Sequence, residues 1–562
     1  MNRILWFIID GIAILITGGI IAFLSVYYSQ STNGIECNKR YFTPSSIDAN
    51  ALDSFVCVCT ADSCDSVIPV GNLEEGDSIA VYQSSKEADR MRKFDIRFVK
   101  DQQNWGNNKI PSLSISIDGS QQFQTIFGFG GAFTDAAGIN INSLSDAAQE
   151  VLMEQYFGDK GINYTIGRVP IASSDFSTRV YSYLDRDGDF ECESFTLAPE
   201  DFSYKIPYIL KASKLSKGRL KLFASPWSAP GWMKTNGQMK GGAPLKGEVN
   251  GKYYKTYSKY LIRFFEEYWK HGITFWAMTI QNEPSNGLKS NFRYQSTNWS
   301  SLGERSFAAK VLKPDMQQST AAKDVKIISL DDNRDLVLQW AKDLYTNDTA
   351  KESDSIDGIG IHWYEPGFYE DLSKVHDIRP DKFILATEAC AGFMPADHIP
   401  LLGDWRRGEQ YGHDIINDLR NWAIGWTDWN LVLDQEGGPN WVLNDVDAPI
   451  IVNRADDEFY KQPLFYFLGH FSKFIPRGSI RIASESSDIN WADLTGNPNP
   501  VEHVAFQAPD GSRILVVMNA DSKNAFRVTL KDNRNEGKIG QLMLPSNSIT
   551  TLLYTGAYPK GT

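Results

Sequence analysis

Between residues 123 and 432, short apolar runs alternate with longer segments in which apolar residues recur at helical spacing. This rhythm is typical of repeated strand–helix units. Eight such units over about 300 residues predict a (β/α)8 barrel, a fold of the α/β class. A doubly wound sheet is the alternative, but it often carries a Gly-rich phosphate turn, and no G-x-G-x-x-G opens a helix here. The strand-like runs are residues 125–132, 163–170, 220–227, 275–283, 325–332, 356–364, 382–388 and 425–432.

The clearest helical segments between these runs are residues 144–157, 253–272 and 334–345. Outside the predicted barrel the apolar period changes to two, with turn signals between the runs. This pattern fills residues 77–120 and the chain after residue 479, and it indicates antiparallel strands. We expect these two flanks to join into one β-sandwich beside the barrel.

These patterns divide the chain into a leader, a small cysteine-rich β unit stapled by disulfides, a β-sandwich and a catalytic barrel. The expected ranges are 1–34 for the leader, 35–70 for the cysteine-rich unit with 433–462 as a candidate addition, 71–122 and 479–562 for the sandwich, and 123–432 and 463–478 for the barrel.

The leader predicts entry into the secretory pathway. Residues 4–28 are almost entirely apolar and follow Arg3. The stretch is longer than an ordinary signal peptide core and close to the length of a membrane span, but Asp10 interrupts it. A cleaved signal peptide and a retained signal anchor are therefore both open.

The cysteines agree with an oxidising compartment. Cys37, Cys57, Cys59 and Cys64 form an even cluster just after the leader, which indicates two disulfides. A zinc site usually has C-x-x-C pairs, whereas one residue separates Cys57 from Cys59. The remaining cysteines, Cys192 and Cys390, are expected to be free.

Three sequons fit a secreted chain. Asn298 and Asn347 lie in polar sequence and are expected to be glycosylated. Asn163 opens a strand-like run and is the weakest of the three candidates.

Composition narrows the class of protein further. Charged residues make up 22% of the chain and hydrophobic residues 42%, which are ordinary values for a globular protein. The net charge of −13 argues against a nucleic-acid partner, which would need a basic surface. The 15 tryptophans either fill the core or stack on the apolar faces of sugars.

Catalytic residues of a barrel lie at the C-terminal ends of its strands. In this chain those ends carry two glutamates, Glu283 within N-E-P and Glu388, with tryptophans at other strand ends. Breaking an acetal needs one carboxylic acid to protonate the leaving oxygen and one carboxylate to meet the anomeric carbon. A strand-end glutamate alone is as often a structural ion pair, but two of them with aromatic neighbours indicate a glycosidase. No metal site or cofactor is expected.

The motifs themselves resemble those of the glucosylceramidase family of lysosomal acid β-glucosidases. The resemblance runs from Cys37 to the last predicted strand, and the cysteine cluster resembles the family's N-terminal pair of disulfides. It is carried by FGFGGAFTDAAG, RVPIASSDFS, SPWSAPGWMKTNG, QNEPSNG, HWY, ATEACAG, GWTDWNL, EGGPNWV and FYKQPLFYFLGHFSKFIPRGS.

The resemblance implies a role for each matching residue. Glu283 would be the acid/base, Glu388 the nucleophile, and Asn282 a hydrogen-bond partner of the sugar 2-hydroxyl. Four residues would hold the remaining hydroxyls or stack on the ring: Asp175, Trp227, Trp429 and Asn444. Four others would orient the nucleophile or line its surroundings: Arg168, His362, Tyr364 and Cys390. Trp276 and Trp363 are interpreted as core residues.

The resemblance also implies a substrate, partners and a location. These are glucosylceramide, a saposin-type activator, anionic phospholipid at a membrane surface, and the lysosome lumen, with membrane anchoring if the leader is retained. Two other functions are weighed against this one. The first is a related retaining barrel glycosidase acting on β-1,6-glucan or β-xylosides, and the second is an inactive, membrane-anchored sugar-binding protein.

Overall fold

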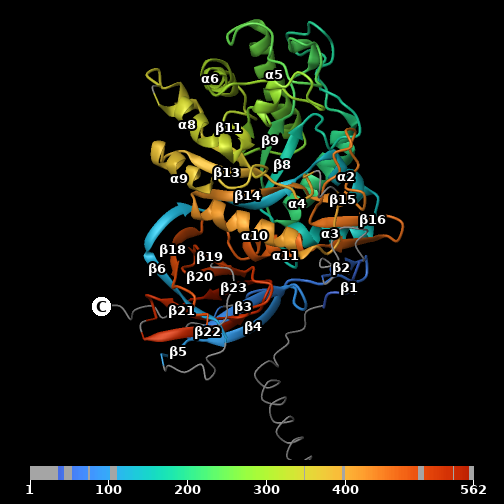
Figure 1. The fold of residues 1–562 in the computed structure, drawn as a ribbon. Coiled ribbons are helices and arrows are strands. Elements are labelled where there is room, and N and C mark those ends of the chain that lie inside the picture. Colours follow the sequence, from blue (N-terminus) through green and yellow to red (C-terminus); the bar gives the residue numbers. More distant parts are fainter. Residues whose placement is uncertain are drawn as a thin grey trace, which may run out of the picture.

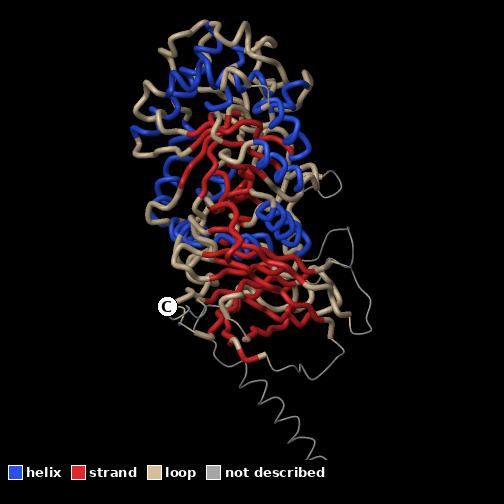
Figure 2. The backbone as a smooth tube through the Cα atoms, turned by 90° about the vertical axis from the view of Figure 1, so that its left-hand side faces the viewer, coloured by secondary structure: helices blue, strands red, loops and turns tan. Residues whose placement is uncertain are grey.

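The computed structural model describes residues 36–42, 54–71, 73, 76–101, 110–346, 348–394, 399–491, 499–535 and 537–555. A strand–helix barrel forms one half of the molecule and a β-sheet domain the other (Figure 1). A smaller sheet lies at the side of the barrel, and the strands of both halves are visible in the perpendicular view (Figure 2).

The barrel is closed by parallel strands in chain order. Each predicted strand-like run overlaps one of them, so the (β/α)8 prediction is confirmed. The strands are β7 (Gly128–Ala132), β8 (Ile166–Ile171), β9 (Lys221–Pro226), β10 (Ala277–Thr279), β11 (Lys326–Asn333), β12 (Gly358–His362), β13 (Phe383–Glu388) and β14 (Ala423–Asn430).

Helices follow the strands around the outside of the barrel. The three predicted segments correspond to α3, to α5 and to a short 3-10 turn continued by α8. The other helices, α2 among them, lie outside these segments. The α-helices are α2 (Asp135–Asn142), α3 (Asp146–Phe157), α4 (Ile206–Leu215), α5 (Lys252–Lys270), α6 (Ser301–Phe307), α7 (Lys313–Met316), α8 (Val337–Tyr345), α9 (Tyr369–Ile378), α10 (Trp405–Arg420) and α11 (Pro463–Ser472). The 3-10 and π turns are η1 (Asp201–Lys205), η2 (Gly231–Met233), η3 (Pro284–Leu288), η4 (Ala308–Leu312), η5 (Arg334–Leu336) and η6 (Glu352–Ser355).

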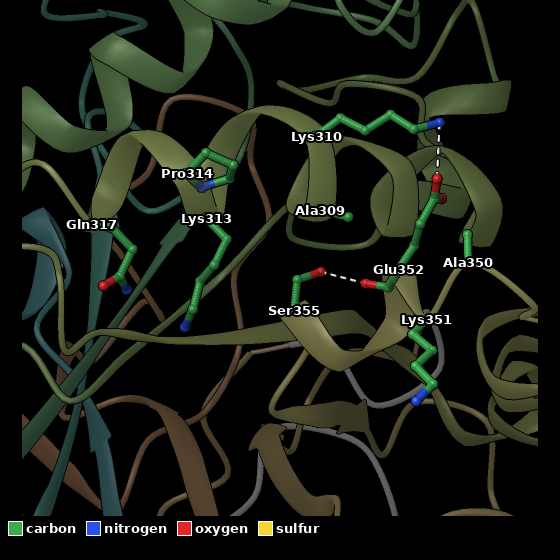
Figure 3. A pocket seen from close by; sticks show the side chains of 9 residues that line it. All are labelled: Ala309, Lys310, Lys313, Pro314, Gln317, Ala350, Lys351, Glu352 and Ser355. Carbon is green, nitrogen blue, oxygen red and sulfur yellow. Dashed lines mark hydrogen bonds and ion pairs between the residues drawn. The ribbon is translucent and has the colours of Figure 1, made fainter.

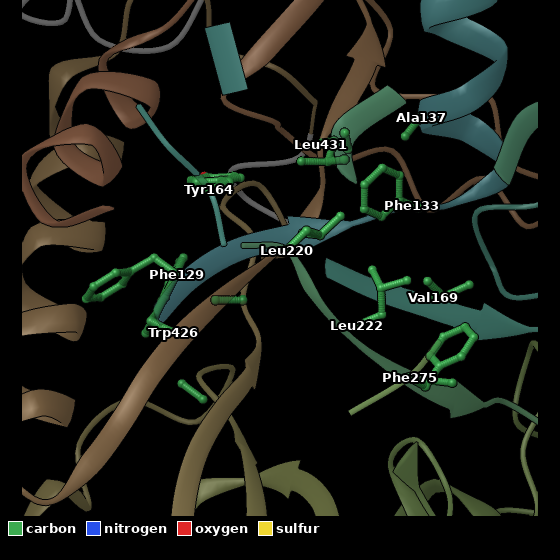
Figure 4. Close-up of a cluster of buried hydrophobic side chains, with 14 of the residues drawn as sticks. Phe129, Phe133, Ala137, Tyr164, Val169, Leu220, Leu222, Phe275, Trp426 and Leu431 are labelled. Carbon is green, nitrogen blue, oxygen red and sulfur yellow. The ribbon is translucent and has the colours of Figure 1, made fainter. Parts of the chain in front are cut away.

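Large apolar side chains fill the space between the strands and these helices. Figure 4 shows part of this core, in which Phe129, Phe133 and Leu222 lie among other buried residues. Every residue of α11 is buried, because this helix lies between the barrel and the sheet domain (Figure 1). Its His470 links the two parts, since its ring nitrogens lie 2.9 Å from Ser84 Oγ and 2.8 Å from Thr551 Oγ1.

The sheet domain combines both flanks of the barrel. Strand β6 pairs with β18, and β3 pairs with β23, so segments more than 300 residues apart share one sheet. The order is β4-β3-β23-β20-β19-β18-β6-β21-β22-β5. Apolar residues from β3, β6, β20 and β22 pack together in one core between the two layers of the sandwich. The bounds are β3 (Ser78–Ser85), β4 (Arg92–Arg97), β5 (Val99–Lys100), β6 (Ser112–Thr125), β18 (Ile480–Ser486), β19 (Val501–Gln507), β20 (Arg513–Asn519), β21 (Phe526–Asp532), β22 (Lys538–Leu544) and β23 (Ser548–Tyr554).

The cysteine-rich segment forms the third sheet with residues that follow the barrel strands. Its members are β1 (Lys39–Arg40), β2 (Val56–Cys59), β15 (Val432–Asp434), β16 (Ile450–Asn453) and β17 (Glu458–Lys461). Disulfides join Cys37 to Cys57 and Cys59 to Cys64, so the prediction of two disulfides in this cluster is confirmed. Cys192 and Cys390 are free and buried.

Several sequence predictions concern segments that the structure describes only in part. The leader and Asn347 lie outside the described residues. Among the helices within the described ranges, none has the length and apolar character needed to cross a membrane. Asn298 is half-buried, and Asn163 is half-buried with a left-handed backbone (φ 58°). Their glycosylation stays a prediction.

Candidate active site

Strands β10 and β13 bring Glu283 and Glu388 together at the C-terminal end of the barrel. One carboxylate oxygen of each and one ring nitrogen of His362 all lie within 4.8 Å of one another. Both glutamates are largely buried. The two strand-end carboxylates singled out in the sequence therefore face each other in the fold.

Arg168, within β8, is a fully buried cation of this site. One of its terminal nitrogens pairs with Glu388 Oε2. The other donates to Asn282 Oδ1 and to Asp331 Oδ2, each at 2.8 Å. Burial lowers the pKa of Arg168, but the Asp331 and Glu388 carboxylates more than offset this and raise it. The guanidinium therefore holds the nucleophile candidate and the sugar-binding candidate Asn282 in one network.

His362 contacts the other glutamate. Its Nε2 lies 2.9 Å from Asp331 Oδ1, and its Nδ1 lies 3.3 Å from Glu283 Oε1 and 3.9 Å from Glu388 Oε1. Burial lowers the pKa of His362, but Glu388, Asp331 and Glu283 together raise it to about 10. A protonated histidine donates from both ring nitrogens, which suits it to orienting carboxylates and leaves it no lone pair with which to act as a base.

Asp331, on β11, joins Arg168 to His362 and was not among the sequence-predicted site residues. Burial alone raises the pKa of its carboxyl group, but Arg168 and His362 bring it well below its usual value. The run 325–332 ends in two aspartates. The strand-end rule that selected Glu283 and Glu388 therefore also contains the signal for Asp331.

Tyr364 is a further donor to Glu388 and also contacts Cys390. The Tyr364 hydroxyl donates to Glu388 Oε1 at 2.6 Å and lies 3.5 Å from Cys390 Sγ. Burial raises the pKa of Glu388, whereas Arg168, His362 and the Tyr364 hydrogen bond act in the opposite direction. The sequence-predicted Tyr364 and Cys390 thus do lie beside this carboxylate.

The backbone and a neighbouring amide fix Glu283. Its φ is 44°, in the left-handed region, and its N–H donates to the Asp331 carbonyl at 2.9 Å. Asn286 Nδ2 donates to Glu283 Oε2 at 2.7 Å. A non-glycine residue in this region is costly and is typical of functional sites. Asn286 was not predicted, although it lies within the QNEPSNG motif.

Trp227 and Trp429 stack on each other beside Arg168. Their ring centroids are 4.9 Å apart with an interplanar angle of 19°. The Arg168 guanidinium carbon lies 5.0 Å from the Trp227 ring and 5.3 Å from the Trp429 ring. By contrast, Trp276 stacks on Phe127 at 3.9 Å, away from these groups, in agreement with its interpretation as a core residue.

A second polar group reaches the site from a loop after β15. Asn444 Nδ2 donates to Asp175 Oδ2 at 2.9 Å, and Arg293 donates to Asn444 Oδ1 at 2.6 Å. Burial, helped by the charge of Glu388, raises the pKa of Asp175 to about 7. Arg293 was not predicted, because its partner lies about 150 residues away in sequence.

A surface pocket of about 550 Å³ lies apart from these carboxylates, between η4, α7 and η6 (Figure 3). Its lining includes Lys310, Lys313 and Lys351, and Lys310 pairs with Glu352 at 2.9 Å. None of its lining residues belongs to the carboxylate site.

Comparison with known proteins places the chain in a family. Residues 126–475 match the glycosyl hydrolase family 30 TIM-barrel domain, and residues 478–552 match the family 30 beta sandwich domain. The lysosomal acid glucosylceramidase of Mus musculus is 41% identical over 477 residues, which cover 84% of this chain and 88% of the mouse protein. A Caenorhabditis elegans protein, named provisionally as glucosylceramidase 3, is 42% identical over 95% of this chain and 98% of its own length.

A solved structure agrees with these sequence matches. SrfJ from Salmonella typhimurium has a TM-score of 0.74 at 31% identity, over 85% of this chain and 99% of that one. The chain matches both family domains, aligns with relatives over most of their length, and shares the fold of SrfJ. It therefore belongs to glycosyl hydrolase family 30 and is a glycosidase.

Proposed function

We propose that this glycosidase hydrolyses glucosylceramide to glucose and ceramide with retention of configuration. The observation that carries the mechanism is the spacing of Glu283 and Glu388, whose nearest oxygens lie within 4.8 Å. Carboxyl groups about 5–5.5 Å apart are typical of retaining glycosidases, whereas inverting enzymes keep about 6.5–9.5 Å for a water molecule.

In the first step, Glu388 attacks the anomeric carbon and forms a covalent glucosyl ester. Glu283 gives its proton to the glycosidic oxygen, and ceramide leaves as the alcohol. In the second step, Glu283 takes a proton from water, which attacks the anomeric carbon and releases Glu388 as a carboxylate. Arg168 and Tyr364 stabilise that carboxylate each time it is freed, because both contact its oxygens.

The remaining residues bind the sugar in this proposal. Asn282 faces the 2-hydroxyl, where a hydrogen bond strengthens in the transition state. Asp175 and Asn444 hold other hydroxyls, and Trp227 and Trp429 offer apolar ring faces. No metal or cofactor takes part in these steps.

The substrate is proposed from the relatives. The mouse protein named as a glucosylceramidase is 41% identical to this chain. An endo-1,6-beta-D-glucanase from Trichoderma harzianum is 26% identical over 78% of the chain. The higher identity favours glucosylceramide, and β-1,6-glucan and β-xylosides remain the rival substrates. The presence of both carboxylates argues against an inactive sugar-binding protein.

The name of the mouse relative supports a lysosomal location. An anionic phospholipid surface and a saposin-type activator are proposed from the motif resemblance alone. The test is glucose release from glucosylceramide, β-1,6-glucan and xylan, each with and without anionic lipid. Release from glucosylceramide, increased by anionic lipid, is the expected result. Turnover of the polysaccharides alone would contradict the proposed substrate.

A further inference from the structure

The backbone that carries Asp331 has an unusual conformation. Leu330 has φ 73° and Asp331 has φ 54°, and the pairing of β11 with β12 shifts register between Leu330 and Asp332. Two consecutive non-glycine residues with positive φ persist only where the surroundings hold them in place. The shift aims the Asp331 carboxylate at both Arg168 and His362.

Glu304, on α6, holds this segment from behind. Its side chain is fully buried. Its Oε2 accepts hydrogen bonds from the Leu330 N–H at 3.1 Å and from Ser329 Oγ at 2.6 Å. Trp340 Nε1 in turn donates to Ser329 Oγ at 2.9 Å. The carboxyl group therefore bonds directly to the first residue of the left-handed pair.

Burial of the Glu304 carboxyl group costs free energy. Within the described part of the chain, Glu304 Oε1 has no hydrogen-bond partner. Burial, together with the charges of Asp331 and Asp332, raises the pKa of Glu304 to about 8. A buried polar atom without a partner costs free energy, so a side chain that served packing alone would be better replaced by an apolar one.

We propose that Glu304 is a positioning residue for catalysis: by fixing the backbone of Leu330 it places Asp331, and through Asp331 it aligns Arg168 with Glu388 and His362 with Glu283. This inference rests on the proposed function, because its effect is measured as turnover. Glu304 acts through Leu330 and Asp331, and Asp331 in turn acts on the glutamates through Arg168 and His362.

Glu409 provides a matched control. It lies on α10, its carboxylate accepts a 2.9 Å hydrogen bond from Trp405 Nε1, and burial raises its pKa to about 7. It resembles Glu304 in chemistry, and among the described residues no hydrogen bond or ion pair links it to the network of Asp331. Glu409→Asp therefore reports the cost of shortening a largely buried acid on the barrel.

The decisive variants are Glu304→Asp and Glu304→Gln. Aspartate withdraws the carboxyl group by one methylene from the Leu330 N–H, and kcat on an activated aryl β-glucoside should fall by about ten- to a hundredfold with little change in KM. Glutamine keeps an oxygen acceptor at full length and should recover most of that loss. Glu409→Asp should leave kcat near the wild-type value.

The pH profile separates positioning from a loss of folded protein. Arg168 and His362, which Asp331 holds in place, lower the pKa of Glu388. Loosening that arrangement should therefore raise the pKa of Glu388, and the acidic limb of the kcat/KM profile of Glu304→Asp should shift to higher pH. A variant that merely contained less folded enzyme would show a lower kcat with an unshifted limb.

These outcomes distinguish the inference from the proposed function. If wild-type protein releases no glucose from the aryl glucoside or from glucosylceramide, the proposed function fails. If wild type is active, and folded Glu304→Asp has the kcat and the pH profile of wild type, only the role of Glu304 is overturned.

Discussion

The hydroxyl of Tyr364 donates a 2.6 Å hydrogen bond to Oε1 of Glu388, the oxygen opposite to the one that Arg168 contacts. Each oxygen of the proposed nucleophile therefore has its own donor. The two donors favour the ionised carboxylate in a buried position where it would otherwise bind a proton. The first prediction depends on this relationship.

Tyr364→Phe should lower kcat/KM by about ten- to a hundredfold, since a hydrogen bond to a charged group contributes about 1.5–3 kcal/mol. The Tyr364 hydrogen bond lowers the pKa of Glu388. Its removal should raise that pKa, and the acidic limb of the kcat/KM profile should move to higher pH. Tyr554→Phe, which removes a similar bond to Asp532 in the sandwich, is the control and should leave the limb in place. An unmoved limb in Tyr364→Phe would contradict the role of Tyr364.

Glu283→Gln should lose about 10²- to 10⁴-fold in turnover of substrates whose leaving group needs a proton. With an activated aryl glucoside the first step needs no acid, and azide can replace the water that Glu283 would activate. Azide should therefore restore turnover and give the β-glucosyl azide, which mass spectrometry and NMR identify. Glu388→Gln serves as the comparison and should yield none of this product. Equal rescue of both variants would remove the assignment of the two roles.

Arg168→Met should destabilise the protein by about 3–5 kcal/mol, because it leaves buried carboxylates without their cation. Arg168 helps to keep the folded-state pKa of Asp331 well below its unfolded value of about 3.9. In wild type this contribution is therefore present above that value and is lost as pH falls further. Without Arg168, burial raises the folded pKa, and protonation relieves the cost as the solution becomes acidic.

The stability gap between wild type and Arg168→Met should consequently be largest at neutral pH and shrink towards pH 4. Denaturant unfolding at several pH values measures it. Arg513→Met, which removes a buried arginine beside Asp532 in the sandwich, should cost stability without abolishing turnover. A gap that grows on acidification would be incompatible with the buried ion pair.

The two disulfides should differ in their contribution to stability. Cys37 and Cys57 are separated by 20 residues and Cys59 and Cys64 by 5. In the loop-entropy description, the longer loop restricts the unfolded chain more, by about 1 kcal/mol. The free energy of unfolding is compared between two double variants, Cys37→Ser/Cys57→Ser and Cys59→Ser/Cys64→Ser. They are matched because each replaces one buried cysteine of β2 by serine. A larger loss from the shorter loop would show that unfolded-chain entropy does not set the order.

The barrel could be predicted because its strands are short apolar runs that recur with helices between them. The run 382–388, for example, is buried along almost all of β13. Helix α2 was missed for the opposite reason. It is short, and its Gly138 packs against the backbone of Tyr204, so neither length nor a strong apolar stripe marks it.

The site divides in the same way. Glu283 and Glu388 were found because the barrel rule fixes where strand-end side chains must meet. The barrel rule cannot identify Arg293 or Glu304, because each is linked to the site by a contact with a residue distant in sequence. The left-handed backbone at Leu330 and Asp331 could not be predicted from the sequence either, since neither residue is a glycine.

The tryptophans show what position adds to composition. Trp227 and Trp429 stack beside Arg168 at the site. Trp426, three residues from Trp429 on β14, is fully buried and donates to Asp414, on the outer side of the barrel wall. On one strand, the same residue type thus serves packing at Trp426 and, in the proposed function, sugar binding at Trp429, and only the register distinguishes the two.

The most direct test of the central proposal is time-resolved proton NMR of glucosylceramide hydrolysis in vesicles that contain anionic phospholipid. If Glu388 forms a glucosyl ester that water then cleaves, β-glucose should appear first, and α-glucose should follow only through mutarotation. α-Glucose as the first-formed anomer, or no glucose from this lipid while β-1,6-glucan is cleaved, would contradict the proposal.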